Sequence, residues 1–258
     1  MELQSIYRNL QIQDMNQMQK SAYKTSENEN DLLLLSPTGS GKTLAFLFPV
    51  LRNLKKENSG IQAMILVPSR ELALQIEQVF KSMGTDFKVS VCYGGHDKKI
   101  EVNNLIESPA LLIGTPGRIA YHLKNDNFDA TTIKTLVLDE FDKSLEFGFH
   151  DDMSLIISEM PLLSQRILTS ATAMTEIPAF TGLNNEATVD FLKVLEIKPD
   201  FKLRKVITTS EGKLETLFQL LCKIGNKRTL IFCNHRDAVD RISELLKEKG
   251  ISRETFHG

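Results

Sequence analysis

The feature that most constrains the fold is a regular alternation of short apolar runs with longer amphipathic segments. The segments between the runs, such as residues 70–83 and 98–107, place apolar residues at the spacing of one helix face. Runs that are apolar on both faces and separated by helices indicate βαβ units and a parallel sheet. We therefore predict an α/β fold with a mostly parallel sheet flanked by helices. The predicted strands are residues 31–36, 63–68, 89–94, 110–115, 135–140, 165–170 and 187–192.

Small or polar residues stand at the ends of most of these predicted strands. Open parallel sheets bind their ligands beyond the carboxyl ends of the strands, so a functional site is expected along that edge. The residues concerned are Ser36, Pro68 and Ser69, Gly94 and Gly95, Gly114 and Thr115, Asp139 and Glu140, and Ser170.

The stretch SPTGSGKT, residues 36–43, lies between a predicted strand and a predicted helix, as a P-loop does. Its glycines let backbone N–H groups turn toward phosphate oxygens, and the helix N-terminus adds positive potential. Lys42 would reach the outer phosphates, and the Thr43 hydroxyl would face Mg²⁺. The strict P-loop pattern begins with glycine, where this chain has Ser36. A glycine-rich turn that binds nothing is the alternative interpretation.

A cluster of carboxylates follows the apolar run of residues 135–138, in the sequence DEFD. Ionised carboxylates are costly to bury and repel one another, so the cluster is either a solvated strand end or a cation site. The P-loop upstream favours the cation site, because in P-loop NTPases a second strand end supplies the acid that holds Mg²⁺. Asp139 fits that role. Glu140, beside it, is placed to orient and deprotonate an attacking water.

The composition excludes several classes of protein. The net charge of −2 gives no bulk attraction to nucleic acid, so any nucleic-acid site must be a local patch. The three cysteines, Cys92, Cys222 and Cys233, have no C-x-x-C spacing, which argues against a disulfide framework or a zinc site. We expect them in or near the core, and reduced thiols fit a cytoplasmic protein. The apolar stretches are far shorter than the roughly 20 residues that span a bilayer, so no membrane segment is expected.

The alternating pattern loosens after about Lys193. Residues 193–205 are charged and contain a proline, which indicates a linker or an exposed strand. Two predicted helices, residues 212–225 and 236–250, then alternate with two predicted strands. These strands are residues 228–234 and 254–258.

Two domains are therefore expected, and the second is small. About 60 residues with so few parallel strands would be marginal as an independent domain, so the sequence is expected to be the front part of a longer protein. We predict a first domain of residues 1–195 and a linker with the beginning of a second domain in residues 196–258. A hinge is predicted between Lys193 and Phe201.

Taken in order, these motifs resemble those of the DEAD-box ATP-dependent RNA helicases, over nearly the whole chain. DEFD resembles the motif that names the family, with Phe141 in place of alanine; the larger ring needs smaller neighbours or another pocket. The other resembling stretches are MNQMQ up to Gln19 as the end of the Q motif, SPTGSGKT, PSRELA at 68–73, the glycine pair 94–95, TPGR at 115–118, SAT at 170–172 and LIFCN at 230–234.

The resemblance implies a RecA-like P-loop domain followed by part of a second RecA-like domain. It implies that Gln19 reads the adenine edge and favours ATP over GTP. Asp139 would hold Mg²⁺, with Glu140 positioning the water and Lys42 acting on the phosphates. The implied phosphate and Mg²⁺ cradle is Thr38, Gly39, Ser40, Gly41, Lys42 and Thr43.

The resemblance also implies an RNA path and a coupling contact. Asp142 would hydrogen-bond to Ser170 and Thr172 and couple the nucleotide state to RNA strand separation. The implied RNA path comprises Pro68, Ser69, Arg70, Gly94, Gly95, Thr115, Gly117 and Arg118. Glycines at strand ends expose backbone N–H groups, and arginines add charge, so the path would contact phosphate and sugar without reading sequence. Taken singly, each arginine is better interpreted as a solvated residue at a helix start.

In the family, the rest of the second domain supplies arginines that reach the ATP phosphates, and an arginine finger is worth about 10³–10⁵ in rate. This chain is therefore expected to bind ATP with Mg²⁺ as a monomer but to hydrolyse it slowly. Two alternatives remain open, a DNA-directed relative and a nucleotide-gated RNA clamp or scaffold that does not hydrolyse ATP.

Overall fold

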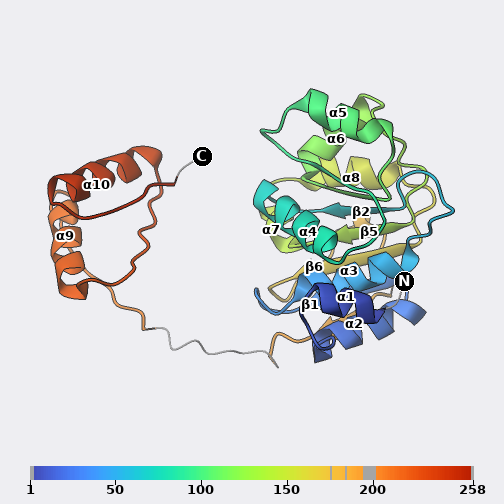
Figure 1. The fold of residues 1–258 in the computed structure, drawn as a ribbon, viewed down its shortest axis with the longest axis horizontal. Coiled ribbons are helices and arrows are strands. Elements are labelled where there is room, and N and C mark those ends of the chain that lie inside the picture. The colour runs from blue at the N-terminus through green and yellow to red at the C-terminus, as the bar shows by residue number, and fades with distance from the viewer. Residues whose placement is uncertain (1–2, 175, 184, 194–201, 257–258) are drawn as a thin grey trace. The chain divides into compact units, whose positions relative to one another are not determined.

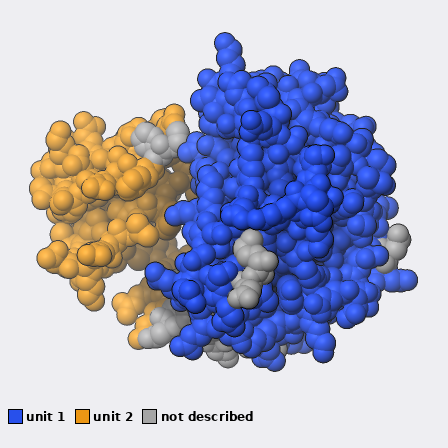
Figure 2. All heavy atoms as spheres, turned by 45° about the vertical axis from the view of Figure 1, so that its right-hand side comes forward, with its two compact units in different colours: residues 1–197 blue, residues 198–258 orange. Residues whose placement is uncertain are grey.

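The computed structural model describes residues 3–174, 176–183, 185–193 and 202–256. The chain divides into two compact units, residues 1–197 and residues 198–258, which are coloured separately in Figure 2. The predicted hinge falls mainly on residues 194–201, which lie outside the described residues.

The first unit is built on a sheet in which every pair of neighbouring strands is parallel (Figure 1). All the strands predicted for this unit are confirmed, within one or two residues at their ends. Among the described residues the strand order across the sheet is β3-β4-β2-β5-β6-β1-β7. The strands are β1 (Asp31–Leu35), β2 (Ala63–Leu66), β3 (Val89–Cys92), β4 (Leu111–Gly114), β5 (Thr135–Leu138), β6 (Gln165–Ser170) and β7 (Ala187–Asp190).

Helices cover both faces of this sheet. One apolar layer packs α1, α2, α3 and α4 against one face, and a second packs α5, α6, α7 and α8 against the other. In the described residues no helix is long and apolar enough to cross a membrane. The helices of the unit are α1 (Leu3–Asn9), α2 (Gln17–Asn28), α3 (Lys42–Asn53), α4 (Arg70–Ser82), α5 (Lys98–Ile106), α6 (Pro116–Lys124), α7 (Phe141–Glu146) and α8 (His150–Ser158), with a short 3₁₀ turn η1 (Ala179–Thr181).

The central strands read as continuous apolar runs because their alternate side chains enter two different layers. In β1, Leu32 and Leu34 join the layer of α3, whereas Leu33 and Leu35 join the layer of α6 and α8. All four leucines are buried. A strand with both faces covered needs no polar positions, and this is why the parallel sheet could be predicted.

The strand order divides the candidate site into two halves. The strands β3, β4 and β2 are neighbours, and the loops after them carry the residues of the predicted RNA path. The strands β5, β6 and β1 are also neighbours, and the loops after them carry the predicted nucleotide and coupling residues. Chain order does not reveal this division, because β1 and β6 lie side by side although most of the unit separates them in sequence.

The second unit contains two helices in its described residues, α9 (Lys213–Ile224) and α10 (Arg236–Glu248). The strands predicted at 228–234 and 254–258 are wrong for the described part of these segments, which forms no strand. Apolar side chains in these segments are exposed to solvent, with Leu230 84% and Phe232 91% exposed. A strand requires a hydrogen-bonded neighbour, and the described residues of this unit offer none to these runs.

Candidate functional site

The P-loop joins the end of β1 to the start of α3, and its backbone requires glycine. Gly41 precedes α3 in the left-handed region, at φ 92° and ψ 24°. A Cβ on Gly41 would lie 2.7 Å from Nε2 of Gln19, so a side chain would also clash. Gly39 is left-handed as well, at φ 77°. These two glycines let the loop turn its N–H groups toward one point, as phosphate binding requires.

The buried side chain of Gln19 connects α2 to the P-loop. Its Nε2 donates to the Gly41 carbonyl at 3.2 Å. Asn16, the N-cap of α2, exchanges hydrogen bonds with Gln19 in a capping box and donates from Nδ2 to the Ser40 carbonyl at 3.1 Å. The sequence reasoning missed Asn16, although Asn-x-x-Gln before a helix is a capping pattern.

Lys42 lies inside the loop rather than in solvent. Its Nζ donates to the Ser36 carbonyl at 2.7 Å, and the residue is 8% exposed. Burial lowers the pKa of Lys42, while the charges of Asp139, Glu140 and Asp142 partly oppose that shift. The ammonium group therefore lies within electrostatic reach of all three carboxylates of DEFD.

Ser36, which stands where the strict pattern has glycine, is buried, and its hydroxyl contacts the Ser40 hydroxyl across the loop. The Thr43 side chain, at the second position of α3, is half-buried, and Thr38 is exposed.

Asp139 follows β5 and is 4% exposed. Its Oδ1 accepts a hydrogen bond from Thr169 Oγ1 at 2.5 Å. Burial raises the pKa of Asp139, and the hydrogen bond from Thr169 and the charge of Lys42 act against this shift. A buried carboxylate beside an ammonium group is suited to hold a cation, because a positive charge offsets its loss of hydration.

Glu140 has an uncommon backbone. It precedes α7 with φ 46° and ψ 51°, in the left-handed region that costs an ordinary residue roughly 1–2 kcal/mol. Its N–H donates to Thr169 Oγ1 at 3.2 Å, so one hydroxyl fixes both Asp139 and Glu140. Such strain is concentrated at functional sites.

Asp142 and the SAT segment are in contact. Thr172 Oγ1 donates to Asp142 Oδ2 at 2.9 Å. Ser170 Oγ instead donates to the Thr172 carbonyl at 2.7 Å, so Ser170 acts within the turn. The predicted contact between Asp142 and Thr172 is therefore present, whereas Ser170 supports it indirectly.

The larger side chain of Phe141 packs in the core. The residue is fully buried in the apolar layer that includes Met153 and Ile156. Its ring centroid lies 6.2 Å from that of Phe180. The larger side chain is thus accommodated in this apolar layer.

The loops after β2 and β3 bring Arg70 beside the glycine pair. Ser69 caps α4 by accepting from the Leu72 N–H at 3.3 Å, and Pro68 before it is buried. Arg70 is exposed and pairs with Glu71 at 2.9 Å. A Cβ on Gly95 would lie 4.0 Å from Arg70 Nη1. A cation and an exposed, side-chain-free backbone therefore share one part of the surface.

The loop after β4 behaves differently from its prediction as a charged surface. Thr115 is 9% exposed and precedes α6, and Gly117 is exposed in the first turn of that helix. The Arg118 side chain, however, is only 10% exposed and turns inward to Glu101, at 2.8 Å. The exposed groups of this loop are thus mainly backbone.

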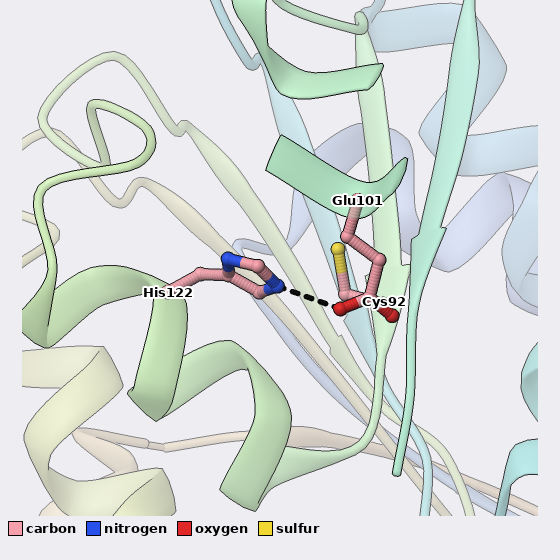
Figure 3. A group of neighbouring side chains, drawn as sticks. All are labelled: Cys92, Glu101 and His122. Carbon is pink, nitrogen blue, oxygen red and sulfur yellow. Dashed lines mark hydrogen bonds and ion pairs between the residues drawn. The ribbon is translucent and has the colours of Figure 1, made fainter. Parts of the chain in front are cut away.

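Sequence reasoning missed the partners of Arg118. Glu101 on α5 is fully buried with His122 on α6, and Figure 3 shows the pair with Cys92. The available signal was weak. Arg118 and His122 are four residues apart, on one face of a helix, and Glu101 lies in a predicted helix like many surface carboxylates. Of the cysteines, Cys92 is buried as expected and Cys233 is half-buried, but Cys222 is exposed, which corrects its placement near the core.

The parallel sheet and the P-loop after β1 define the RecA-like class of α/β folds. The DEAD/DEAH box helicase family matches residues 16–180, which is more than half of the chain. The chain therefore belongs to the DEAD/DEAH box helicase family, and the resemblance inferred from its motifs is confirmed.

Relatives with assigned names support the same family. ATP-dependent RNA helicase CshA of Limosilactobacillus reuteri is 34% identical over 233 residues, which cover 88% of this chain and 47% of that protein. DEAD-box ATP-dependent RNA helicase RhpA of Helicobacter pylori (strain B128) is 31% identical over 245 residues, covering 93% and 50%. The chain thus spans about half the length of the curated relatives it matches.

Solved structures share the fold. A DEAD box protein from the hyperthermophile Methanococcus jannaschii matches with a TM-score of 0.65 and 26% identity, over 98% of this chain and 69% of that one. A hypothetical ATP-dependent RNA helicase from Sulfolobus tokodaii matches with a TM-score of 0.67 and 22% identity, over 95% and 72%. The second likeness is one of fold alone.

Proposed function

We propose that the chain is the nucleotide-binding part of an ATP-dependent RNA helicase, which separates short RNA duplexes or remodels RNA–protein complexes. The observation that carries this proposal is the convergence of Lys42, Asp139 and Glu140 at neighbouring strand ends. Motif spacing alone cannot produce that convergence, which depends on β1 and β5 both lying beside β6.

The residues present fit a nucleoside triphosphate with a divalent cation. Lys42 is one ammonium group facing three carboxylates, so this part of the site has an excess of negative charge. A divalent cation would balance that excess, and Asp139 with Thr43 would hold it. When bound, Mg²⁺ neutralises charge on the phosphate oxygens. A Cβ on Gly39 would meet open space, so the loop is accessible from outside.

Each residue of the nucleotide half then has a distinct task. The P-loop N–H groups and Lys42 bind and orient the phosphates, with Gly39, Ser40 and Gly41 forming the turn. Glu140, held through its backbone by Thr169, orients the attacking water and takes its proton. Gln19 stands beside Gly41 and selects adenine through its amide.

The other half of the sheet edge is proposed to bind the RNA backbone. Arg70 supplies charge, and the exposed Gly94, Gly95 and Gly117 supply backbone N–H groups for phosphate and sugar. Pro68, Ser69 and Thr115 shape the same loops. These groups carry no pattern of base-edge donors and acceptors, so binding is expected to be independent of sequence.

The bond between Asp142 and Thr172 is proposed to couple the two halves. Asp142 lies just after Asp139 and Glu140 in the chain, and Thr172 lies just after β6. A shift of Asp139 or Glu140 would therefore be passed through Asp142 to the SAT turn, residues 170–172. The role assigned to Ser170 is to hold Thr172 in place.

We further propose that residues 1–195 form the ATP-binding domain and that residues 196–258 are the linker and the N-terminal part of a second RecA-like domain. The division into two compact units supports this boundary. Leu230 and Phe232 are apolar and exposed, which supports a second unit whose apolar residues pack against a further part of the domain. This chain alone would then bind ATP as a monomer and hydrolyse it slowly.

Calorimetric titration of ADP with Mg²⁺ tests the nucleotide assignment. Lys42→Ala should weaken binding about tenfold or more, because it removes a charge-assisted contact to phosphate. Lys56→Ala removes an exposed lysine that pairs with Asp86 and serves as the control. Equal ADP affinity in wild type and Lys42→Ala would refute the site. GTP binding as tight as ATP binding would remove the role of Gln19.

A further inference from the structure

A buried carboxylate lies behind the RNA half of the sheet edge. Glu101 is fully buried on α5, and Figure 3 shows its contact with His122. Further groups surround both of its oxygens. Oε1 accepts from the Tyr93 N–H at 2.9 Å and lies 3.2 Å from His96 Nδ1. Oε2 accepts from Arg118 Nη1 at 2.8 Å and lies 2.7 Å from His122 Nε2. Four groups, two from the loop after β3 and two from helix α6, therefore meet on one side chain.

The contact with Asn127 indicates which nitrogen of His122 donates to Glu101. Asn127 Nδ2 lies 3.0 Å from His122 Nδ1 and can only donate, so Nδ1 accepts and Nε2 carries the proton given to Glu101. Burial by itself would raise the pKa of Glu101, but the bonds from His122 and the Tyr93 N–H and the charge of Arg118 hold that pKa below its usual value. The cluster thus contains the ion pair of Glu101 and Arg118, and the Tyr93 N–H and two histidine rings contact the same carboxylate.

A metal site is the competing interpretation. Ligand atoms of Cys92, Glu101 and His122 lie within 4.8 Å of one another, and all three residues are buried. Burial, however, raises the pKa of Cys92 to about 12, so its sulfur keeps a proton. Both Glu101 oxygens are already engaged, and Arg118 adds a positive charge beside them. These groups favour a hydrogen-bonded clamp over a cation site.

The clamp holds together the two loops that carry the exposed glycines. Through the Tyr93 N–H, Glu101 fixes the backbone immediately before Gly94 and Gly95. Through Arg118, it fixes the first turn of α6, which contains Gly117. Arg118 Nη1 also donates to the His96 carbonyl at 3.1 Å, so the same guanidinium group joins both loops directly.

We propose that Glu101 is a positioning residue for RNA binding, and that Arg118 acts with it as an internal clamp rather than as a phosphate contact. The pair sets the direction of the backbone N–H groups of the two loops, which would contact the RNA backbone. This inference rests on the proposed RNA-binding function of the same loops and names the residues on which their geometry depends.

The direction in which Glu101→Gln changes the RNA affinity distinguishes a positioning role from a purely electrostatic one. Removing a negative charge near an RNA site would strengthen binding by electrostatics alone. If Glu101 positions the loops, Glu101→Gln should instead weaken binding although the protein becomes more positive. The substitution keeps the size of the side chain, but its amide nitrogen would face a donor in either orientation, the Tyr93 N–H at one oxygen position or the Arg118 guanidinium at the other. Glu107→Gln, on the exposed end of the same helix, makes the equal charge change and is the matched control.

The experiment measures the affinity of the full chain for a short fluorescein-labelled oligouridine by anisotropy, with Mg²⁺ and a non-hydrolysable ATP analogue. Glu101→Gln and Arg118→Ala should each raise the Kd about tenfold, and the double variant should be no weaker than Arg118→Ala alone. Glu107→Gln should bind at least as well as wild type. The affinity for ADP should stay within about twofold in every variant, which shows that the sheet is intact.

Salt dependence provides the second readout. Loss of a lysine or arginine contact to single-stranded RNA reduces the slope of log Kd against log salt by about 0.7. Arg118→Ala should leave the slope unchanged, because its contacts are internal. A reduced slope, or additive effects in the double variant, would overturn the clamp and make Arg118 a phosphate contact. Wild-type or tighter RNA binding by Glu101→Gln would overturn the role of Glu101.

These failures differ from failure of the proposed function. If wild type and Arg70→Ala both showed no RNA binding above that of an unrelated acidic protein, the RNA path itself would be wrong, and the clamp with it. If wild type binds and Arg70→Ala weakens binding while Glu101→Gln does not, only the present inference fails. Cys92→Ala should keep the RNA affinity of wild type, because the clamp does not use the thiol. A metal site would instead lose a ligand in this variant. If RNA affinity fell in Cys92→Ala, and added zinc raised the affinity of wild type but not of the variant, the metal site would be favoured.

Discussion

The two halves of the sheet edge differ in the groups that they present: one presents charged side chains, and the other presents mainly backbone. After β1, β5 and β6, charged side chains face one another, with Lys42 and Asp139 buried at the edge. After β2, β3 and β4, the exposed groups are mainly glycine backbone and Arg70, and the buried charges Glu101 and Arg118 lie behind them. Both halves bury opposite charges, and in the second half these charges form the ion pair of Glu101 and Arg118.

This difference matches the proposed ligands. A triphosphate with its cation is compact and highly charged, so a few side chains at fixed distances can hold it. An RNA strand is long and repetitive, so a row of backbone donors on rigid loops suits it better. The strand order keeps the two sets apart, because β2 and β5 are the only neighbours across the boundary among the described strands.

The largest expected effect belongs to the nucleotide half. In the complete protein, Glu140→Gln should lower ATP turnover by about 10²–10⁴, because the amide keeps the shape but cannot take a proton. Steady-state ATPase rates at saturating ATP and RNA measure this. Glu146→Gln, an exposed carboxylate at the end of the helix that follows Glu140, is the control. Wild-type turnover in Glu140→Gln would mean that these carboxylates form a solvated strand end.

A smaller effect is expected at the contact that joins the halves. Asp142→Asn weakens the bond from Thr172 without touching the water, so strand separation should fall about three- to tenfold while ATPase activity falls less. Duplex-release and ATPase rates, measured on the same preparation, give the ratio. An equal fall in both rates would place Asp142 in the chemical step instead.

The sequence predicted the first unit well because burial on both faces of a strand leaves a simple pattern. The strands of this unit and the loops after them follow from apolar runs that end in glycine or acid, as at Gly94 and Asp139. The runs at 228–234 and 254–258 have the same pattern but form no strand in their described residues. Apolar composition marks a segment that can be buried, whereas a strand also requires a neighbour.

The clamp shows what pattern reasoning cannot reach. Glu101 and Arg118 have the composition of surface residues on helices, and Arg118 was predicted to face RNA. Their burial depends on how α5 and α6 pack over the end of β3, which is a tertiary property. The left-handed backbone of Glu140 could not be predicted from the sequence either, because it is held by Thr169 on the neighbouring strand β6.

The separation of the two halves is the central claim, and one paired measurement tests it. ADP affinity by calorimetry and oligouridine affinity by anisotropy, the latter without nucleotide, are determined for wild type, Lys42→Ala, Arg70→Ala and the control Lys56→Ala. The account predicts that Lys42→Ala loses ADP affinity and keeps RNA affinity. It predicts that Arg70→Ala weakens RNA binding about three- to tenfold and keeps ADP affinity, since it loses one charged contact. Loss of both affinities in either variant, with Lys56→Ala unchanged, would contradict it.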